Sequence, residues 1–268
     1  MKKLLTTVIA AAIYLALSSC VMVNTAGYHY DNYDQYKTGG AEIKDEVQNI
    51  EVDWISGEVL LIETENSTVS FEEKSSHALR SQDKMRYWYE SSSKTLHIKF
   101  CEPIVHSIET KEKDLFIYVP QNYAFNEVLF NVVSANIKMN NINAAVFDID
   151  SVSGDVQITT NSTESIFLNS VSGNVTVNAA NVSSLEFDTV SGDLEVSINT
   201  GKEIEMESVS GDLDLYLAKE LGFNIYAETN GSVDYNMEVG GRGDVYTYGS
   251  QELQVNYESI SGDISINN

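Results

Sequence analysis

The chain is short of cysteine, proline and basic residues. Its 268 residues include two cysteines, two prolines and only 16 lysines and arginines. Beyond Cys20 the only cysteine is Cys101, so an internal disulfide is excluded and the fold is not of the disulfide-stapled class. Cys101 directly follows Ile98-Lys99-Phe100, which predicts a packed strand residue rather than a reactive thiol.

Acidic residues outnumber basic ones by 40 to 16, and the formal net charge is −24. Binding to nucleic acid or along an anionic lipid surface requires clustered basic residues, so this balance argues against both. It favours a soluble, self-repelling surface, or the binding of cations.

Common catalytic and cofactor-binding motifs are also missing. The sequence has no Gly-x-Ser-x-Gly elbow, no phosphate-binding loop, and no metal-ligand spacing among its histidines, which are His29, His77, His97 and His106. Asp148 and Asp150 would share the outer face of one strand. Paired carboxylates can serve glycoside hydrolysis, but that chemistry needs a cleft, and a solvated outer face is the simpler interpretation. We predict a protein that is not an enzyme and uses no cofactor.

The N-terminus has the pattern of a secretory signal. Met1-Lys2-Lys3 precedes an apolar run from Leu4 to Leu17, which at 14 residues is short for a transmembrane helix. Leu17-Ser18-Ser19-Cys20 resembles the bacterial lipobox, in which the cysteine becomes the lipidated first residue of the mature protein. An ordinary cleaved signal is the alternative. We predict that Cys20 carries acyl chains such as palmitate and anchors the protein to a bacterial membrane, facing away from the cytoplasm. Removal of residues 1–19 would change the net charge from −24 to −26, since Lys2 and Lys3 are lost with no acid.

The stretch Val152-Ser153-Gly154-Asp155-Val156 organises the chain because it recurs. Its close copies place glycines in steps of 19 residues, at Gly154, Gly173, Gly192 and Gly211. Looser copies are centred on Ala135, Gly231 and Gly262, and the spacing slips at the last two. A fixed period of this kind predicts a repeat array.

Apolar residues recur at positions −7, −5, −2, +2 and +4, counted from each glycine. The clearest repeat has Phe147, Ile149, Val152, Val156 and Ile158. Alternation with a period of two predicts two short strands per repeat, with a bend between −5 and −2. Stacking at about 4.8 Å would bury the apolar face of each repeat against its neighbours. The glycine either adopts a positive φ at a corner or points inward where no larger side chain fits.

The predicted fold is all-β: a parallel β-solenoid with about 19 residues per repeat. The chain divides into a signal peptide over 1–19, a flexible tether over 20–45, an N-terminal β-cap over 46–120 and the repeat solenoid over 121–268. The cap contains a predicted hairpin, in which residues 85–89 and 95–100 flank a polar turn.

These residues resemble the bacterial putative-adhesin family, whose members carry repeated Val-Ser-Gly-Asp-Val units. Ile50–Val59 is similar to the first strand of that domain, and Leu115–Pro120 is similar to the strand that leads into its repeats. The resemblance covers roughly residues 46–268 and departs at Ala135, at 230–232 and at 235–252. It implies a secreted or membrane-attached all-β solenoid with a role in adhesion, and it names no ligand.

Two further features are candidate sites. The +1 position carries Asp155, Asp193, Asp212 and Asp263, with Asn174 and Ser232 in two of the copies, and stacked carboxylates attract calcium; solvated turn residues are the alternative. Arg242-Gly243-Asp244 forms a tripeptide that an integrin-like receptor could bind, or it is simply part of a glycine-rich loop.

We therefore predict a lipid-anchored cell-envelope protein that displays its solenoid to a glycan or protein ligand. An envelope-side scaffold or stress-sensing accessory protein is the alternative. A polysaccharide-acting enzyme is disfavoured because the array has few basic residues, namely Lys138, Lys202, Lys219 and Arg242.

Overall fold

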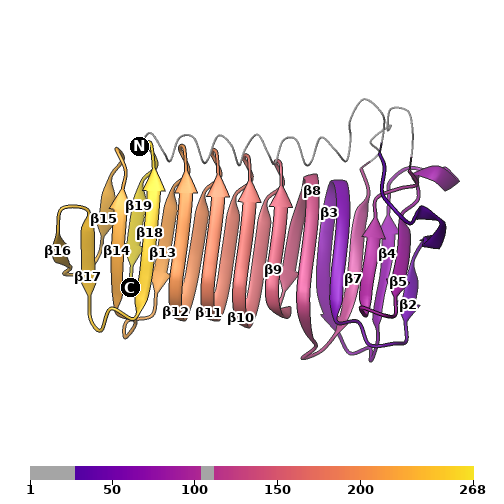
Figure 1. Cartoon of the computed structure of the whole chain (residues 1–268), viewed down its shortest axis with the longest axis horizontal. Coiled ribbons are helices and arrows are strands. Elements are labelled where there is room, and N and C mark those ends of the chain that lie inside the picture. Colours follow the sequence, from indigo (N-terminus) through magenta and orange to yellow (C-terminus); the bar gives the residue numbers. More distant parts are fainter. Residues whose placement is uncertain (1–27, 104–111) are drawn as a thin grey trace.

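The computed structural model describes residues 28–103 and 112–268, which form one elongated stack of strands (Figure 1). Within these residues there is no α-helix, and the only helical turns are the 3-10 segments η1 (Tyr33–Gln35) and η2 (Ser81–Asp83). Neighbouring strands of the array pair in parallel. The prediction of an all-β, solenoid-like fold is confirmed.

The middle of the stack consists of five strands, of which the last three each run from one Val-Ser-Gly turn to the next. They are β8 (Ala124–Asn140), β9 (Asn143–Ser151), β10 (Val156–Ser170), β11 (Val175–Thr189) and β12 (Leu194–Ser208). Val156 lies opposite Val175, and Val175 lies opposite Leu194. The Val-Ser-Gly turn is one corner of each layer. A second corner lies within the strand, where the pairing of β10 with β11 skips Asn161 and Glu164.

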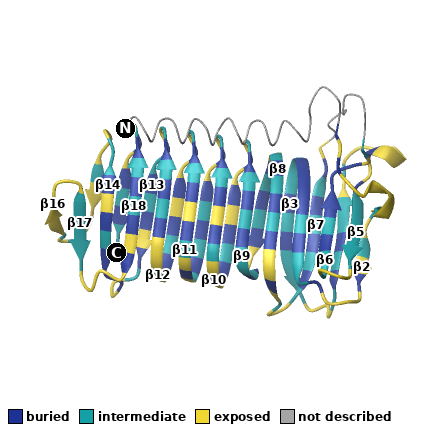
Figure 2. Cartoon of the chain, in the orientation of Figure 1, coloured by how far each residue is buried: buried dark blue, intermediate teal, exposed yellow. Residues whose placement is uncertain are grey.

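Side chains alternate between the core and the surface along each layer, which Figure 2 shows as bands of buried and exposed residues. The residues at −7, −5, +2 and +4 are buried, as in Phe147, Ile149, Val156 and Ile158. The prediction that −2 is a core position is wrong, since Val152 is only half-buried. The period of two continues past −5, so the residue at −3 points inward and the corner follows it. The buried −3 residues carry hydroxyls: Ser151, Ser170, Thr189, Ser208 and Ser259.

The last strands of the chain do not form the last layer. The C-terminal end contains β13 (Leu213–Leu217), β14 (Phe223–Glu228), β15 (Val233–Tyr235), β16 (Gly240–Arg242), β17 (Val245–Tyr248), β18 (Leu253–Ser259) and β19 (Ile264–Asn267). β18 pairs with β12 on one side and β14 on the other, and β19 lies between β13 and β15. The slip in the glycine spacing therefore reflects an inserted layer, with Gly262 between Gly211 and Gly231.

The first long strand is inserted in the same way. The N-terminal end contains β1 (Lys37–Thr38), β2 (Ala41–Ile43), β3 (Asn49–Thr64), β4 (Val69–Lys74), β5 (Arg86–Glu90), β6 (Thr95–Lys99) and β7 (Asp114–Pro120). β3 pairs in parallel with β8 on one side and with β6 and β7 on the other. The antiparallel strands β5 and β4 then close this end of the stack.

Residues 28–45 differ from the predicted tether. Tyr28 is buried, and its hydroxyl accepts a hydrogen bond from the amide of Phe100. The hydroxyl of Tyr30 donates to the carbonyl oxygen of Cys101. The strands β1 and β2 pair with β5 and β4. The sequence around these tyrosines has no strand period. Tyr28 and Tyr30 nevertheless pack their rings on the cap, because an aromatic side chain buries a large area without needing regular spacing.

Candidate binding surfaces

The column of repeat glycines is explained by close packing between layers. A Cβ atom on Gly173 would lie 2.1 Å from the carbonyl oxygen of Gly154, and one on Gly262 would lie 2.0 Å from that of Gly211. Neither glycine has a positive φ. Of the two interpretations of the repeat glycine, the inward position without room for a side chain is therefore correct.

The +1 column is an internal hydrogen-bond ladder. The amide of Asp193 donates to Oδ1 of Asn174, and the amide of Asp212 donates to Oδ1 of Asp193, both over 3.0 Å. Asn serves as well as Asp because only a side-chain oxygen is required. These side chains therefore have a structural role. Within residues 28–103 and 112–268, no group of three or more His, Cys, Asp or Glu side chains is arranged to hold a metal ion.

The buried hydroxyls at −3 form a second ladder that the sequence reasoning missed. The amide of Gly173 donates to Oγ of Ser170, and the amide of Gly192 donates to Oγ1 of Thr189, both over 2.9 Å. A buried amide without a partner is costly, so a hydroxyl is needed at this position. The signal was present in the sequence as a Ser or Thr three residues before five of the six repeat glycines, all except Gly231.

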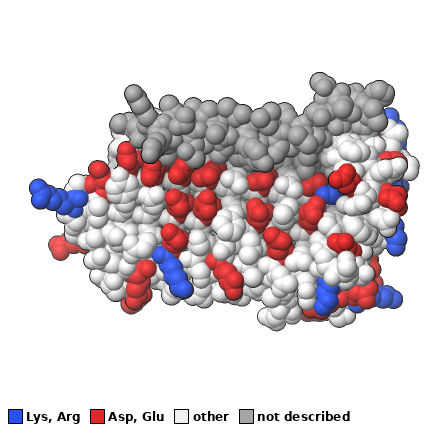
Figure 3. All heavy atoms as spheres, in the orientation of Figure 1, with Lys and Arg blue, Asp and Glu red and all other residues white. Residues whose placement is uncertain are grey.

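A face rich in carboxylates lies on the outer side of the strands that end at the Val-Ser-Gly turns. We call it the acidic face and define it by Asp148, Asp150, Glu186, Asp188, Glu205, Glu207 and Glu258, at the −6 and −4 positions of β9, β11, β12 and β18, and by Glu228 of β14, which lies opposite Glu258. Figure 3 shows carboxylates gathered in rows on this side of the molecule. Asp148 and Asp150 thus belong to the outer face, as the sequence predicts.

Successive carboxylates repel one another most strongly in the middle of the acidic face. Asp188 lies opposite Glu207, and Glu207 lies opposite Glu258. Burial, together with Glu186 and Glu205, raises the pKa of Asp188 to about 6. Burial, together with Asp188 and Glu258, raises the pKa of Glu207 to about 7. A ligand that brings positive charge to this face would relieve the repulsion.

Amide side chains separate the carboxylates at the β9 end of the acidic face. Asn169 donates through Nδ2 to Oδ1 of Asp150 over 2.9 Å. Between Asp188 and Glu258 the same column holds carboxylates in consecutive strands, with no amide between them. The greatest density of uncompensated negative charge therefore lies over β11, β12 and β18.

The same two columns continue into the cap, where cations neutralise them. Lys99 of β6 pairs with Asp53 and lies 2.6 Å from Oε1 of Glu51, while His97 Nδ1 lies 2.9 Å from Oε2 of Glu51. Burial opposes the ionisation of Glu51, but the bonds from His97 and Lys99 outweigh it and hold its pKa at about 2. Asn131 completes the cluster by donating to Asp53. These carboxylates are structural partners and are not available to a ligand.

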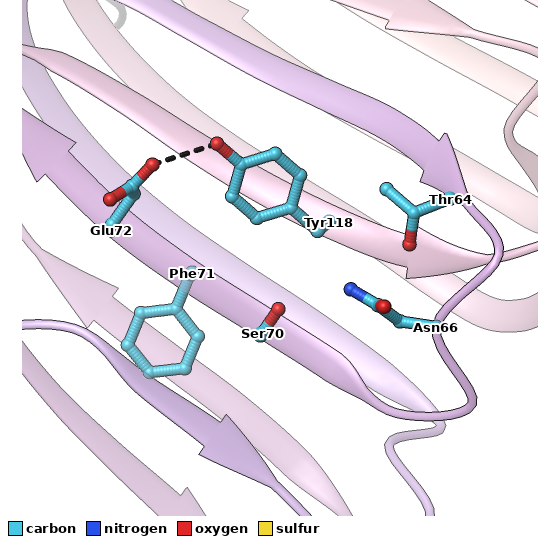
Figure 4. A pocket seen from close by; sticks show the side chains of 6 residues that line it. All are labelled: Thr64, Asn66, Ser70, Phe71, Glu72 and Tyr118. Atoms are coloured by element: carbon cyan, nitrogen blue, oxygen red, sulfur yellow. Dashed lines mark hydrogen bonds between the residues drawn. The ribbon is translucent and has the colours of Figure 1, made fainter.

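A shallow hollow of about 410 Å³ lies beside the β3–β4 turn (Figure 4). It is lined by Thr64, Asn66, Ser70, Phe71, Glu72 and Tyr118. The hydroxyl of Tyr118 donates to Glu72 over 2.8 Å, and Lys74 forms an ion pair with Glu72 over 2.9 Å. Its only lining carboxylate is already paired, so the hollow does not offer the two carboxylates that glycoside hydrolysis requires.

The other predicted site residues lie apart from one another. Cys20 is outside the described residues. Cys101 is buried, and burial raises the pKa of its thiol to about 12, which fits an inert packed residue. His97 belongs to the cap cluster, His29 and His77 are exposed elsewhere, and His106 is outside the described residues. Arg242-Gly243-Asp244 lies at the turn between β16 and β17.

Comparison with known proteins gives one family and several similar structures. The family model described as Toastrack DUF4097 matches residues 46–268. A solved structure of a putative adhesin from Bacteroides fragilis is 12% identical, covers 86% of this chain and 97% of its own, and has a TM-score of 0.45. A putative adhesin from Parabacteroides distasonis is 12% identical, with 86% and 97% covered and a TM-score of 0.43. A putative cell adhesion protein from Clostridium sporogenes is 18% identical, with 86% and 99% covered and a TM-score of 0.37.

No protein of curated function matches the chain. In the described part of the structure, no helix has the length and hydropathy that crossing a membrane requires.

Proposed function

This chain belongs to the Toastrack family DUF4097, and we propose that it is a non-catalytic, lipid-anchored protein of the bacterial cell envelope with an adhesin-like role. The observation that carries the proposal is the acidic face, which presents carboxylates from adjacent strands on one side of a regular stack. An extended surface of this kind suits the binding of an extended partner, whereas catalysis on a small substrate usually takes place in a concave site.

The proposed mechanism is display on a rigid support. The backbone pairing and the two side-chain ladders repeat in each layer, so the spacing of the surface carboxylates is set by the stack itself. The negative field would steer a partner with exposed basic groups and would repel acidic ones. The ligand would be a protein or a glycan that presents positive charge to this face.

An anchor on Cys20 would be limited in its distance from the cap by the length of the chain between them. Residues 21–27 are the seven residues between Cys20 and the packed Tyr28. A chain of that length reaches at most about 25 Å. An acyl anchor on Cys20 would therefore hold the cap end near the membrane. On one side of the stack the strands pair in an unbroken series from β1 in the cap to β16 at the opposite end. At about 4.8 Å per strand this series is roughly 55–60 Å long.

The test is protease accessibility on intact cells, read with an antibody against residues 121–268. We expect the wild-type protein to be found in the membrane fraction and the Cys20→Ala variant to be found in the soluble fraction. We also expect added protease to cleave the wild-type protein on intact cells. Protection until the envelope is opened would contradict surface display and would favour the scaffold role. A Cys20→Ala protein that stays in the membrane fraction would contradict the lipid anchor.

Binding through the acidic face is tested by a variant that neutralises its centre with Glu186→Gln, Asp188→Asn, Glu205→Gln and Glu207→Gln. We expect this variant to lose binding to beads coated with a basic protein, with the loss greatest at low salt. Glu195→Gln, on the other outward face, is the matched control and should bind like the wild type. Equal binding by all three proteins would exclude the acidic face as the binding surface.

A further inference from the structure

The hairpin formed by β16 and β17 lies at the end of the stack farthest from the cap (Figure 1). β17 pairs antiparallel with β14, and β16 pairs antiparallel with β17. Arg242 lies opposite Val245, so Gly243 and Asp244 are the two residues of the turn. The tripeptide Arg242-Gly243-Asp244 thus occupies the tip of a tight hairpin.

The backbone of this tip is well defined. Gly243 has a φ of +66°, and the ideal position of a Cβ atom there meets no other atom within 4 Å. Gly241 has a φ of +114°, and a Cβ atom on it would lie 2.0 Å from the carbonyl oxygen of Val245. The amide of Ala227 in β14 donates to the carbonyl oxygen of Asp244 over 2.9 Å. The turn is therefore held by its glycines and tied to the stack.

The two charged side chains of the tip are free to meet a partner. Arg242, Gly243 and Asp244 are all exposed. In the described part of the chain, neither charged side chain makes an ion pair or a side-chain hydrogen bond. Some other cations are paired: Arg86 pairs with Glu102 over 2.8 Å, and Lys138 pairs with Glu58 over 2.7 Å.

The fold does not require this pair of charges. A two-residue hairpin turn with glycine first is satisfied by almost any second residue, and among the described residues no hydrogen bond or ion pair that holds the tip uses the guanidinium or the carboxylate. Arg242 and Asp244 instead place a bidentate cationic donor and a short carboxylate on either side of a glycine. A guanidinium pairs with an acidic side chain, and a carboxylate completes the shell of a divalent cation.

We propose that Arg242-Gly243-Asp244 is a receptor-recognition tip. Its ligand class is an animal cell-surface receptor of the integrin kind, in which a bound divalent cation accepts the Asp244 carboxylate and an acidic pocket accepts the Arg242 guanidinium. The proposal rests on the proposed function insofar as the tip must face outward from the cell. Its position opposite the anchored end of the stack suits that role.

The experiment measures binding of an Arg-Gly-Asp-binding integrin ectodomain, in manganese buffer, to the full-length chain immobilised on a biosensor. We expect saturable binding that EDTA and a cyclic Arg-Gly-Asp peptide abolish. Asp244→Glu lengthens the carboxylate by one methylene and should weaken binding at least tenfold. Asp234→Glu makes the same change at an exposed position of β15 and is the matched control, which should bind like the wild type.

Absence of binding by the wild type would overturn the proposal, as would equal binding by Asp244→Glu. Arg242→Ala provides a second variant, and an unchanged melting temperature of each variant shows that the hairpin end is still folded. Because the assay uses purified protein, it does not depend on where the protein lies in the cell. A positive result here with protease protection on intact cells would overturn surface display and leave the recognition tip intact.

Discussion

The backbone amide of Asp263 donates a hydrogen bond of 2.7 Å to Oδ1 of Asp212, which lies 51 residues earlier in the chain. In the preceding layers the same bond joins residues 19 apart, as between Asp212 and Asp193. After β13 the chain therefore leaves a gap, builds the layer beyond it, and returns to fill the gap with β18 and β19. The C-terminal strands are interior parts of the stack.

Removing residues 253–268 should unfold the C-terminal end rather than shorten it. The deletion takes away inward side chains that fill the inserted layer, namely Leu253, Val255, Tyr257, Ile264 and Ile266. Burial of each of these side chains contributes about 1.5–3 kcal/mol to the free energy of unfolding. The sum for the five approaches the whole stability of a typical domain. We expect a smaller strand signal and a lower melting temperature than in the wild type, measured by circular dichroism, because the layers from the cap to β12 can stay folded. A truncated protein that melts like the wild type would contradict the inserted layer.

Gly173→Ala should destabilise the stack because its methyl group would overlap the carbonyl oxygen of Gly154. We expect a loss of about 1–3 kcal/mol in the free energy of unfolding, measured by urea titration. Ser172→Ala changes the exposed neighbour and should cost less than about 0.5 kcal/mol. Similar values for the two variants would show that the glycine column is not tightly packed.

Asp193→Ala should remove the acceptor that the amide of Asp212 uses, at a cost of about 0.5–1.5 kcal/mol. Asp193→Asn keeps a side-chain oxygen in place, as Asn174 does in the neighbouring layer, and should be nearly neutral. The two variants are compared by chemical denaturation. If Asn is as damaging as Ala, the charge of Asp193 matters and the ladder account fails.

Glu207→Gln should stabilise the protein at pH 8 and have little effect at pH 4.5. The pKa of Glu207 is about 7 in the folded protein, above its ordinary value of 4.5, so the folded state holds the proton to higher pH than the unfolded chain. The free energy of unfolding therefore falls as pH rises from about 4.5 to 7. Relief of about 1 kcal/mol of repulsion would raise the melting temperature at pH 8 by about 2–4 °C.

Glu195→Gln serves as the control for that experiment because Glu195 is exposed on the other outward face. It should leave the melting temperature unchanged at both pH values. A pH-independent effect of Glu207→Gln would mean that the repulsion within the acidic face is negligible.

Lys99→Met should be strongly destabilising because it leaves Asp53 buried without a cation. Removal of one partner of a buried pair costs about 3–5 kcal/mol. Lys138→Met breaks an ion pair of 2.7 Å with Glu58 in which both side chains are substantially exposed, and it should cost at most about 1 kcal/mol. Equal losses, measured by urea unfolding, would contradict a buried role for Lys99.

Several features of the stack could be predicted because they depend on local repetition. The repeat glycines and the alternation in Phe147, Ile149, Val156 and Ile158 follow from the geometry of a strand and from the stacking of like layers. The −3 hydroxyls were missed because Ser and Thr are common surface residues, and nothing in their type reveals that a buried glycine amide needs an acceptor. The packing of Tyr28 and Tyr30 was missed because it has no period.

By itself, the sequence determined the all-β class, the stacking of the repeats and the core positions −7, −5, +2 and +4, since these follow from a pattern that recurs along the chain. The tertiary structure alone decided the positions of β3 and of β18 with β19. These strands pair with residues that are distant in sequence. The sequence does not specify their positions, because a strand with one apolar face can fit between any two layers of the same register. It also decided which carboxylates are neutralised, because Lys99 reaches Glu51 and Asp53 across a strand pairing, while Glu207 lies between Asp188 and Glu258.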